Sequence, residues 1–248
     1  MISVLLATYL TLFQPHLVEG RRRPLTVVAG GGGGDMVIGN HAQGKSVNSA
    51  AISVDTPVDT AVSGSVFVVS CSYPSGSTFN SVTDNFSNTY VTAGAELTGT
   101  SGMGSRKTRV LYCNGGCTGG SSHTWTCNLT GSGNVGILAV ELKNAIASNV
   151  LDQATQNTDT SSPFTSSITT TVANAGIVTV VWGDSGTTPA THAENGISGS
   201  TVVESITDTQ WWTGAMAVKI VSSISTYAPS WTENGGASAN VHVLNIKD

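Results

Sequence analysis

The sequence is short of charge. Lysine, arginine, aspartate and glutamate together make up 10% of the 248 residues, against about 25% in an ordinary soluble protein. A net charge of -5 and a pI near 5.4 provide no basic face for a phosphate backbone, which excludes nucleic acid as an expected partner. Glycine, serine, threonine, asparagine and valine dominate the rest. Such a chain either stays soluble through hydroxyls and amides or buries much of its surface in an assembly.

Long apolar runs are also missing. The longest, "ISVLLATYLTLF" over residues 2–13, is too short to cross a membrane, so no membrane span is predicted. Its length suits the core of a signal peptide, but no positive charge precedes it and "QPHLVEG" is a poor cleavage site. We therefore expect an apolar arm that docks on other subunits, with a signal peptide as the alternative. The arm's candidate contact residues are Leu5, Leu6, Leu10, Leu12, Phe13, Arg21, Arg22 and Arg23.

One stretch matches a phosphate-binding pattern, "GNHAQGKS" from Gly39 to Ser46. A phosphate loop needs a buried strand before it and a helix after it, because the helix N-terminus holds the phosphates. Here only "MVI" precedes it, behind the five glycines of residues 30–34, and "VNSAAISVDTPVDT" follows without a helix signal. The pattern is therefore interpreted as a coincidence in a Gly-rich segment, and no nucleotide or other cofactor is predicted.

Four cysteines leave two possibilities open. "CNGGC" is typical of a tight loop in which Cys113 and Cys117 form a disulfide or remain free thiols. Cys71 and Cys127 lie in strand-like runs, where a buried thiol behaves as a small apolar side chain. No spacing of cysteine and histidine matches a zinc site, so no metal is expected.

Helix-period patterns are almost absent, apart from a weak candidate over residues 141–154. Instead, short runs rich in Val, Ile, Thr and aromatics alternate with turn residues, which predicts an all-β antiparallel sandwich, jelly-roll or immunoglobulin-like. Residues 1–50 are predicted to be an extended docking arm and residues 51–248 the sandwich domain. About a dozen strands are expected, at 51–55, 65–73, 79–84, 89–97, 107–113, 122–130, 135–142, 166–172, 176–184, 200–208, 212–221 and 240–246.

No residue constellation points to catalysis, and the chain is predicted not to be an enzyme. Carboxylates such as Asp84, Glu96, Glu141 and Glu204 can pair only in space, and the sequence prefers none of them. Adjacent residues of a strand point to opposite faces, so one of Trp211 and Trp212 is a candidate exposed contact, for example with a sugar ring.

Several motifs in order resemble a β-sandwich module of tailed-phage virion proteins and bacterial surface proteins. "GSVFVVSCSY" is followed by "FNSVTDNFSNTYVTAG", which is similar to a strand leading into an Asp-x-x-x-Asn-x-Tyr turn, with Ser87 in place of the usual glycine before Asn88. "GNVGILAVELKNA", "VLDQAT", "TSSPFTSSITTTVANAGIVTVVWG" and "WWTGAMAVKI" complete the series. The resemblance covers most of the chain and implies a sandwich fold without catalytic residues.

Two roles follow as hypotheses. The first is a structural subunit of a virion (a capsid decoration, fibre or tail-associated protein) held by its N-terminal arm to copies of itself or to other virion proteins. The alternative is a secreted or cell-surface module that binds carbohydrate as a lectin or adhesin does. The two can coexist, because a virion subunit can also contact glycans of a host surface.

Overall fold

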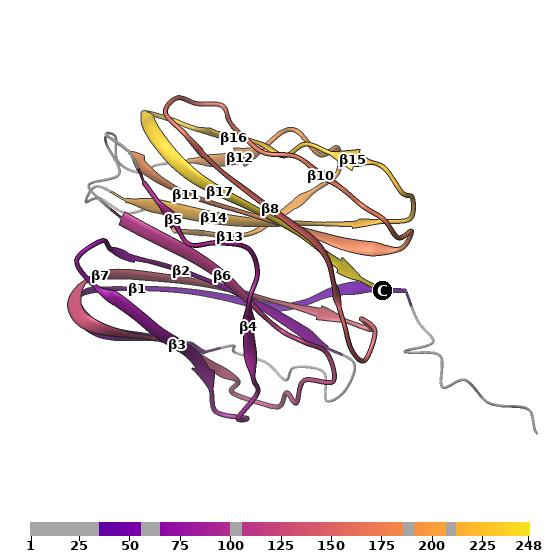
Figure 1. Ribbon diagram of the computed structural model, residues 1–248, viewed down its shortest axis with the longest axis horizontal. Coiled ribbons are helices and arrows are strands. Elements are labelled where there is room, and N and C mark those ends of the chain that lie inside the picture. The colour runs from indigo at the N-terminus through magenta and orange to yellow at the C-terminus, as the bar shows by residue number, and fades with distance from the viewer. Residues whose placement is uncertain (1–34, 56–64, 100–105, 186–190, 207–211) are drawn as a thin grey trace, which may run out of the picture. The chain divides into compact units, whose positions relative to one another are not determined.

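The computed structural model describes residues 35–55, 65–99, 106–185, 191–206 and 212–248 (Figure 1), which leaves the predicted contact residues of the arm outside the described residues. The described ranges contain strands and no helix, so the predicted all-β class is confirmed. They also contain no helix long and apolar enough to cross a membrane.

The first half of the chain forms one antiparallel sheet, sheet A. Its strand order is β1-β7-β2-β6-β4; in addition β3 pairs with β7, and β5 pairs with β6. The strands are β1 (Val37–Asp55), β2 (Val66–Pro74), β3 (Thr78–Asp84), β4 (Tyr90–Thr92), β5 (Leu97–Thr98), β6 (Arg106–Cys113) and β7 (Thr124–Lys143).

The second half forms a five-stranded antiparallel sheet, sheet C, and two small sheets. Sheet C has the order β13-β14-β11-β17-β8, and the small sheets have the orders β12-β16-β9 and β10-β15. The strands are β8 (Leu151–Asp159), β9 (Phe164–Thr165), β10 (Ile168–Thr169), β11 (Ala175–Ser185), β12 (His192–Glu194), β13 (Thr201–Ile206), β14 (Thr213–Val221), β15 (Thr226–Tyr227), β16 (Ser230–Glu233) and β17 (Gly236–Lys247).

Counted within its own half, each sheet has the same strand order. The five strands of sheet C lie in the order first, last, second, fourth, third, and β1, β7, β2, β6 and β4 of sheet A follow the same sequence. The registers correspond as well. Val68 lies between Tyr112 and Val140 in sheet A, and Val180 lies between Met216 and His242 in sheet C. The sandwich therefore consists of two halves with one topology.

The described residues form three hydrophobic clusters. The middle cluster joins the facing sides of sheets A and C through residues such as Val68, Val140, Val180 and Val218. A second cluster, around Phe67 and Trp125, lies on the other face of sheet A, where the first part of β7 and β3 curl over it. The third, around Trp231, lies between sheet C and the small sheets.

Burial on both faces explains why the central strands have continuous apolar runs rather than alternation. All residues of β2 from Val66 to Tyr73 are buried, because their odd and even positions enter different clusters. The first part of β7 does alternate: Trp125, Cys127 and Leu129 are buried, while the residues between them are partly exposed.

Several predicted boundaries differ from the structure. Residues 89–97 contain β4 and only the first residue of β5, residues 166–172 contain only β10, and β8 lies where no strand is predicted. The division between residues 50 and 51 falls inside β1, which pairs with β7 from Val37 to Asp55, so residues 37–50 belong to sheet A. Residues 122–130 and 135–142, predicted as two strands, lie mostly in the single strand β7. The weak helix candidate over 141–154 is the end of β7, a connection and the start of β8.

The two sheets are also joined by buried hydrogen bonds. The Trp182 indole donates to the Ser70 hydroxyl (2.7 Å), and Thr108 Oγ1 lies 2.8 Å from Nε2 of His242. Burial lowers the pKa of His242 to about 3. Behind sheet C, the His192 side chain lies between Ser205 and Thr213, and burial lowers its pKa to about 4.

The lowered pKa values of His192 and His242 predict that the fold loses stability in acid. An unfolded histidine binds a proton near pH 6.5, whereas His242 and His192 stay neutral in the fold until about pH 3 and 4. The unfolded state therefore takes up protons first as the pH falls. We expect the free energy of unfolding to decrease below about pH 6.5, by up to about 1.4 kcal/mol per pH unit for each histidine. Urea unfolding followed by tryptophan fluorescence between pH 7 and 4.5 measures this decrease. A flat profile would contradict it, and His242→Gln is expected to make the profile shallower.

Candidate functional site at the disulfide loop

The turn between β3 and β4 is organised by one carboxylate. Asp84 Oδ1 accepts hydrogen bonds from the backbone N–H groups of Phe86 (3.1 Å) and Asn88 (2.9 Å), an arrangement in which an aspartate side chain closes a turn. Ser87 has a φ of 60°, in the left-handed region that glycine adopts most easily. This conformation explains why a glycine would suit the position before Asn88.

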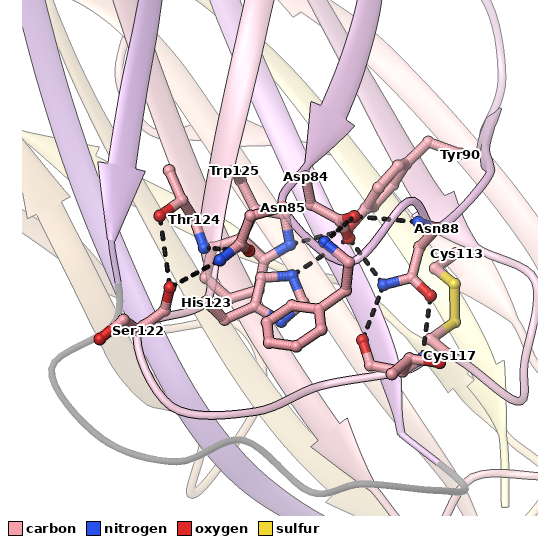
Figure 2. A network of polar contacts seen from close by, with 12 residues as sticks. Asp84, Asn85, Asn88, Tyr90, Cys113, Cys117, Ser122, His123, Thr124 and Trp125 are labelled. Atoms are coloured by element: carbon pink, nitrogen blue, oxygen red, sulfur yellow. Dashed lines mark hydrogen bonds and ion pairs between the residues drawn. A yellow bond between two sulfur atoms is a disulfide. The ribbon is translucent and has the colours of Figure 1, made fainter.

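The second oxygen of Asp84 connects side chains from three segments (Figure 2). Oδ2 accepts hydrogen bonds from Asn88 Nδ2 (2.7 Å) and the Tyr90 hydroxyl (2.8 Å), and His123 Nε2 lies 3.1 Å away. The Tyr90 hydroxyl in turn accepts from the indole N–H of Trp125 (2.7 Å). The Asp84 and His123 side chains are completely buried.

Burial alone would raise the pKa of Asp84, because a carboxylate is poorly solvated inside a protein. The hydrogen bonds from His123, Asn88 and Tyr90 outweigh that effect and hold the pKa well below its usual range. Asp84 is therefore a buried negative charge satisfied by donors on several sides. We name Asp84, Asn88, Tyr90, His123 and Trp125 the Asp84 cluster.

Asn88 links this cluster to the disulfide loop. Its side-chain amide donates to the carbonyl of Thr118 (2.8 Å) and accepts from the Thr118 backbone N–H (2.9 Å). Cys113 and Cys117 are joined in a disulfide, one of the two states that the sequence allows (Figure 2). Within the loop Gly115 has a φ of 82°, and an added Cβ would lie 2.6 Å from the Ala147 backbone, so glycine is required there.

A groove of about 430 Å³ opens beside this loop. It is lined by Ser87, Asn88, Thr89, Val91, Cys113, Asn114, Gly115, Gly116 and Cys117. The lining contains no charged side chain, and both of its walls are held in place by the disulfide and by the Asp84 cluster. The geometry suits recognition of an uncharged surface by a rigid loop.

The His123 ring of the Asp84 cluster packs among aromatic rings. The His123 ring lies 4.4 Å from the Trp125 ring, 4.5 Å from that of Phe67 and 4.9 Å from that of Phe86, measured between centroids. His123 is thus both a partner of Asp84 and a filler of the hydrophobic cluster. No local pattern in the sequence signals this double role, since His123 meets Asp84 only when β3 pairs with β7.

The remaining candidate residues lie elsewhere. Trp212 is 3% exposed and packs against Trp182, with the Arg106 guanidinium 4.4 Å above its ring, so the expectation of an exposed contact is wrong for this residue. Trp212 immediately precedes β14 and belongs to the cluster between sheets A and C. Trp211 lies outside the described residues.

The four carboxylates that the sequence left open have separate partners. Glu96 binds Arg109 and Lys107, Glu141 accepts from Ser65, and Glu204 lies 2.7 Å from His41. Asp84 belongs to its own cluster.

The phosphate-like sequence pattern forms part of a strand. Gly39 to Ser46 is part of β1, in register with β7, and no helix follows it in the described residues. Within the same part of the chain, no group of three or more His, Cys, Asp or Glu side chains could hold a metal ion.

Comparisons of the chain with models of known protein families, with curated proteins and with solved structures found no match.

The Asp84 cluster can be tested by removing one charge. Asp84→Asn places an amide N–H₂ where the carboxylate accepts hydrogen bonds, and we expect a loss of about 2–4 kcal/mol in the free energy of unfolding. Asp35→Asn, at an exposed position, is the matched control and should change stability little. Chemical denaturation of both variants measures the difference. Equal stability of the two variants would contradict the assigned role of Asp84.

The cysteines predict a three-step alkylation pattern. Cys71 and Cys127 are free and buried, and burial raises the pKa of the Cys71 thiol well above its usual value. We expect iodoacetamide to modify no cysteine in the native protein, two after unfolding without reductant, and four after unfolding with reductant. Intact-mass spectrometry counts the adducts. Four adducts without reductant would contradict the Cys113–Cys117 disulfide.

Proposed function

We propose that this chain is a non-enzymatic structural subunit of an extracellular assembly, and that the assembly is a virion in which it serves as a capsid decoration, fibre or tail-associated protein. The observation that carries the proposal is the side of the sandwich formed by β1 and β13, the edge strands of sheets A and C. We call it the β1/β13 side.

The β1/β13 side has an unusual share of exposed apolar side chains. Val47 is 62% exposed and Val37 46% on β1, and Val202 is 39% exposed on β13. The described residues contain only two other large exposed hydrophobics, Val91 and Ile224. Edge strands present backbone groups that can pair with another chain, and exposed apolar side chains on such strands add surface that a partner can bury.

A side-chain contact also fixes the shape of the β1/β13 side. His41 on β1 binds Glu204 on β13 at 2.7 Å, which ties the edges of the two sheets together. Next to this pair lies a pocket of about 270 Å³ lined by Gln43, Gly44, Lys45, Ser205 and Ile206. A partner strand or side chain would therefore meet a fixed shape.

The titratable groups support a structural role over a catalytic one. Asp84, His192 and His242 have shifted pKa values, which are common at catalytic sites. Here, however, each of these three side chains is held by hydrogen bonds in the interior, between packed strands. His192 contacts Ser205 on the face of β13 that is turned away from sheet A, because Ser205 pairs with Ala215 of the outer cluster.

The sequence supplies the remaining support. The apolar run of residues 2–13 and the Arg21–Arg23 cluster precede β1 in the sequence. The motif series resembles virion sandwich modules, and the disulfide fits an environment outside a reducing cytosol. We assign the sandwich provisionally to the jelly-roll or immunoglobulin-like group, and we expect its partners to be copies of itself and other virion proteins.

Self-association of the full chain tests the proposal. We expect sedimentation velocity to show concentration-dependent oligomers, and we expect Val37→Lys with Val47→Lys to reduce the association constant at least tenfold, because the lysines place charge in an apolar contact. Val91→Lys, on the opposite edge of sheet A, is the matched control and should leave association unchanged. Leu5→Ser with Leu6→Ser and Leu10→Ser examines the arm separately. A monomer at all concentrations, or equal effects of the Val37/Val47 double variant and the Val91 variant, would reject the β1/β13 side as the self-contact.

A further inference from the structure

Arg106 is a buried arginine that has no negatively charged partner. It begins β6, is 7% exposed, and donates from Nε to the Ser72 hydroxyl (3.0 Å) and from Nη2 to the carbonyl of Asn134 (2.8 Å). No carboxylate in the described ranges forms an ion pair with it. Burial lowers the pKa of Arg106 to about 10, so the guanidinium is still charged at neutral pH. A charge taken out of water normally requires a counterion, because the loss of its hydration is costly.

The indole N–H of Trp212 is also buried, and it has no hydrogen-bond acceptor in the described part of the chain. The other three tryptophan indoles that the structure describes each donate to a hydroxyl group. Because most buried polar groups in proteins have a partner, an orphaned donor points to an acceptor that the fold itself does not provide.

These two groups are in contact. The Arg106 guanidinium lies 4.4 Å from the centre of the Trp212 ring. A Cβ added to Gly136 of β7 would lie 2.4 Å from Cζ3 of Trp212, so this edge of the ring is pressed against β7, and Nε1, on the opposite edge of an indole, points away from it. An arginine carries five N–H donors, and only two of those of Arg106 are bonded within the described residues. Free donors of a cation and a free indole N–H are thus joined in one stacked pair.

The adjacent polar side chains do not supply the missing acceptor. Thr108 is the next residue on this face of β6; its hydroxyl lies 2.8 Å from Nε2 of His242 and accepts from Asn240 Nδ2 (3.2 Å). Asn240 Oδ1 in turn accepts from the Thr158 hydroxyl. These groups satisfy one another, so the complement of Arg106 and Trp212 is an anion from elsewhere.

The charge and shape of the pair narrow the class of anion. Lys107 and Arg109, the other cations of β6, lie on the opposite face of the strand and pair with Glu96. One positive charge therefore needs one negative charge, whereas a phosphate monoester carries more. A carboxylate has a single charge, and its two oxygens match the planar fork of a guanidinium.

We propose that Arg106 and Trp212 bind one carboxylate group from outside this chain, with the guanidinium neutralising its charge and the indole N–H donating to one of its oxygens. The carboxylate belongs to a small organic acid or to an aspartate or glutamate side chain of a partner. This inference does not rest on the proposed assembly, because a single subunit contains both residues.

Nuclear magnetic resonance of the ¹⁵N-labelled full chain provides the test, because the Arg106 Nε–H and the Trp212 indole N–H each give a signal. The probes are sodium acetate, the peptide acetyl-Ala-Glu-Ala-amide, sodium sulfate and sodium chloride, at equal ionic strength. Ligands of this size should have a dissociation constant on the order of 1 mM. We expect acetate and the peptide, added to about 10 mM, to move both signals saturably, sulfate to bind more weakly and chloride to leave them in place. Tighter binding of the peptide identifies a side chain as the source, and equal or tighter binding of acetate identifies a small acid.

Variants separate this site from general effects of salt. Arg106→Gln removes the charge and should weaken acetate binding at least tenfold. Lys107→Gln, the matched control, removes the same charge from the other face of β6 and should leave binding unchanged. Trp212→Phe keeps an aromatic ring without the N–H and should weaken binding at least threefold, measured at the Arg106 signal. The amide spectrum of each variant confirms that it is folded.

Asp208→Asn examines whether the chain supplies the carboxylate itself, since Asp208 shortly precedes Trp212 in the sequence. We expect this change to leave the Trp212 signal and acetate binding as they are. A moved Trp212 signal with tighter acetate binding would show that Asp208 occupies the site, and would overturn the proposal. Absence of saturable shifts with both carboxylates, tighter binding of sulfate or chloride, or equal effects of Arg106→Gln and Lys107→Gln would overturn it as well.

Discussion

The contact between the facing sides of sheets A and C is the interaction on which the rest of the structure depends. Val68 and Val140 from one sheet meet Val180 and Val218 from the other, and all four are almost completely buried. Because the outer faces of both sheets are covered as well, the central strands have no side facing water. Charged side chains have little room in such strands, and this is the physical reason for the low charge of the sequence.

The same burial decides how polar groups are used. Ser70, Thr108 and His242 lie between the sheets and bind each other or an indole N–H across them, because an unpaired polar group would be costly there. Asp84 follows the same rule at the edge of the second cluster, where donors from the turn and from β7 neutralise the cost of a buried charge. The polar residues of the interior thus fix how strands meet.

Much of the fold could be predicted from the sequence, because it depends on local patterns. Strand-forming runs and turn residues indicated the all-β class, and the Asp-x-x-x-Asn-x-Tyr spacing indicated the turn that Asp84 closes. Pairing over longer distances could not be predicted. His123 joins Asp84 only through the register of β3 and β7, and the length of β1 depends on its alignment with β7 rather than on its own glycine-rich sequence.

Trp212 shows the same limit at a single residue. Strand alternation predicts that Trp211 and Trp212 point to different faces, but it does not say whether a face is covered. Sheet A covers the Trp212 side, where Arg106 and Trp182 enclose the ring.

The common strand order of the two halves has a further consequence. In this arrangement one polypeptide contains two sheets of the same strand order, which pack together as the two subunits of a homodimer would. In a true homodimer every substitution occurs twice, so a new loop on one side must also be tolerated on the other. Here each half is free to change alone, and the halves do differ: the first contains the disulfide loop and the second contains the two small sheets.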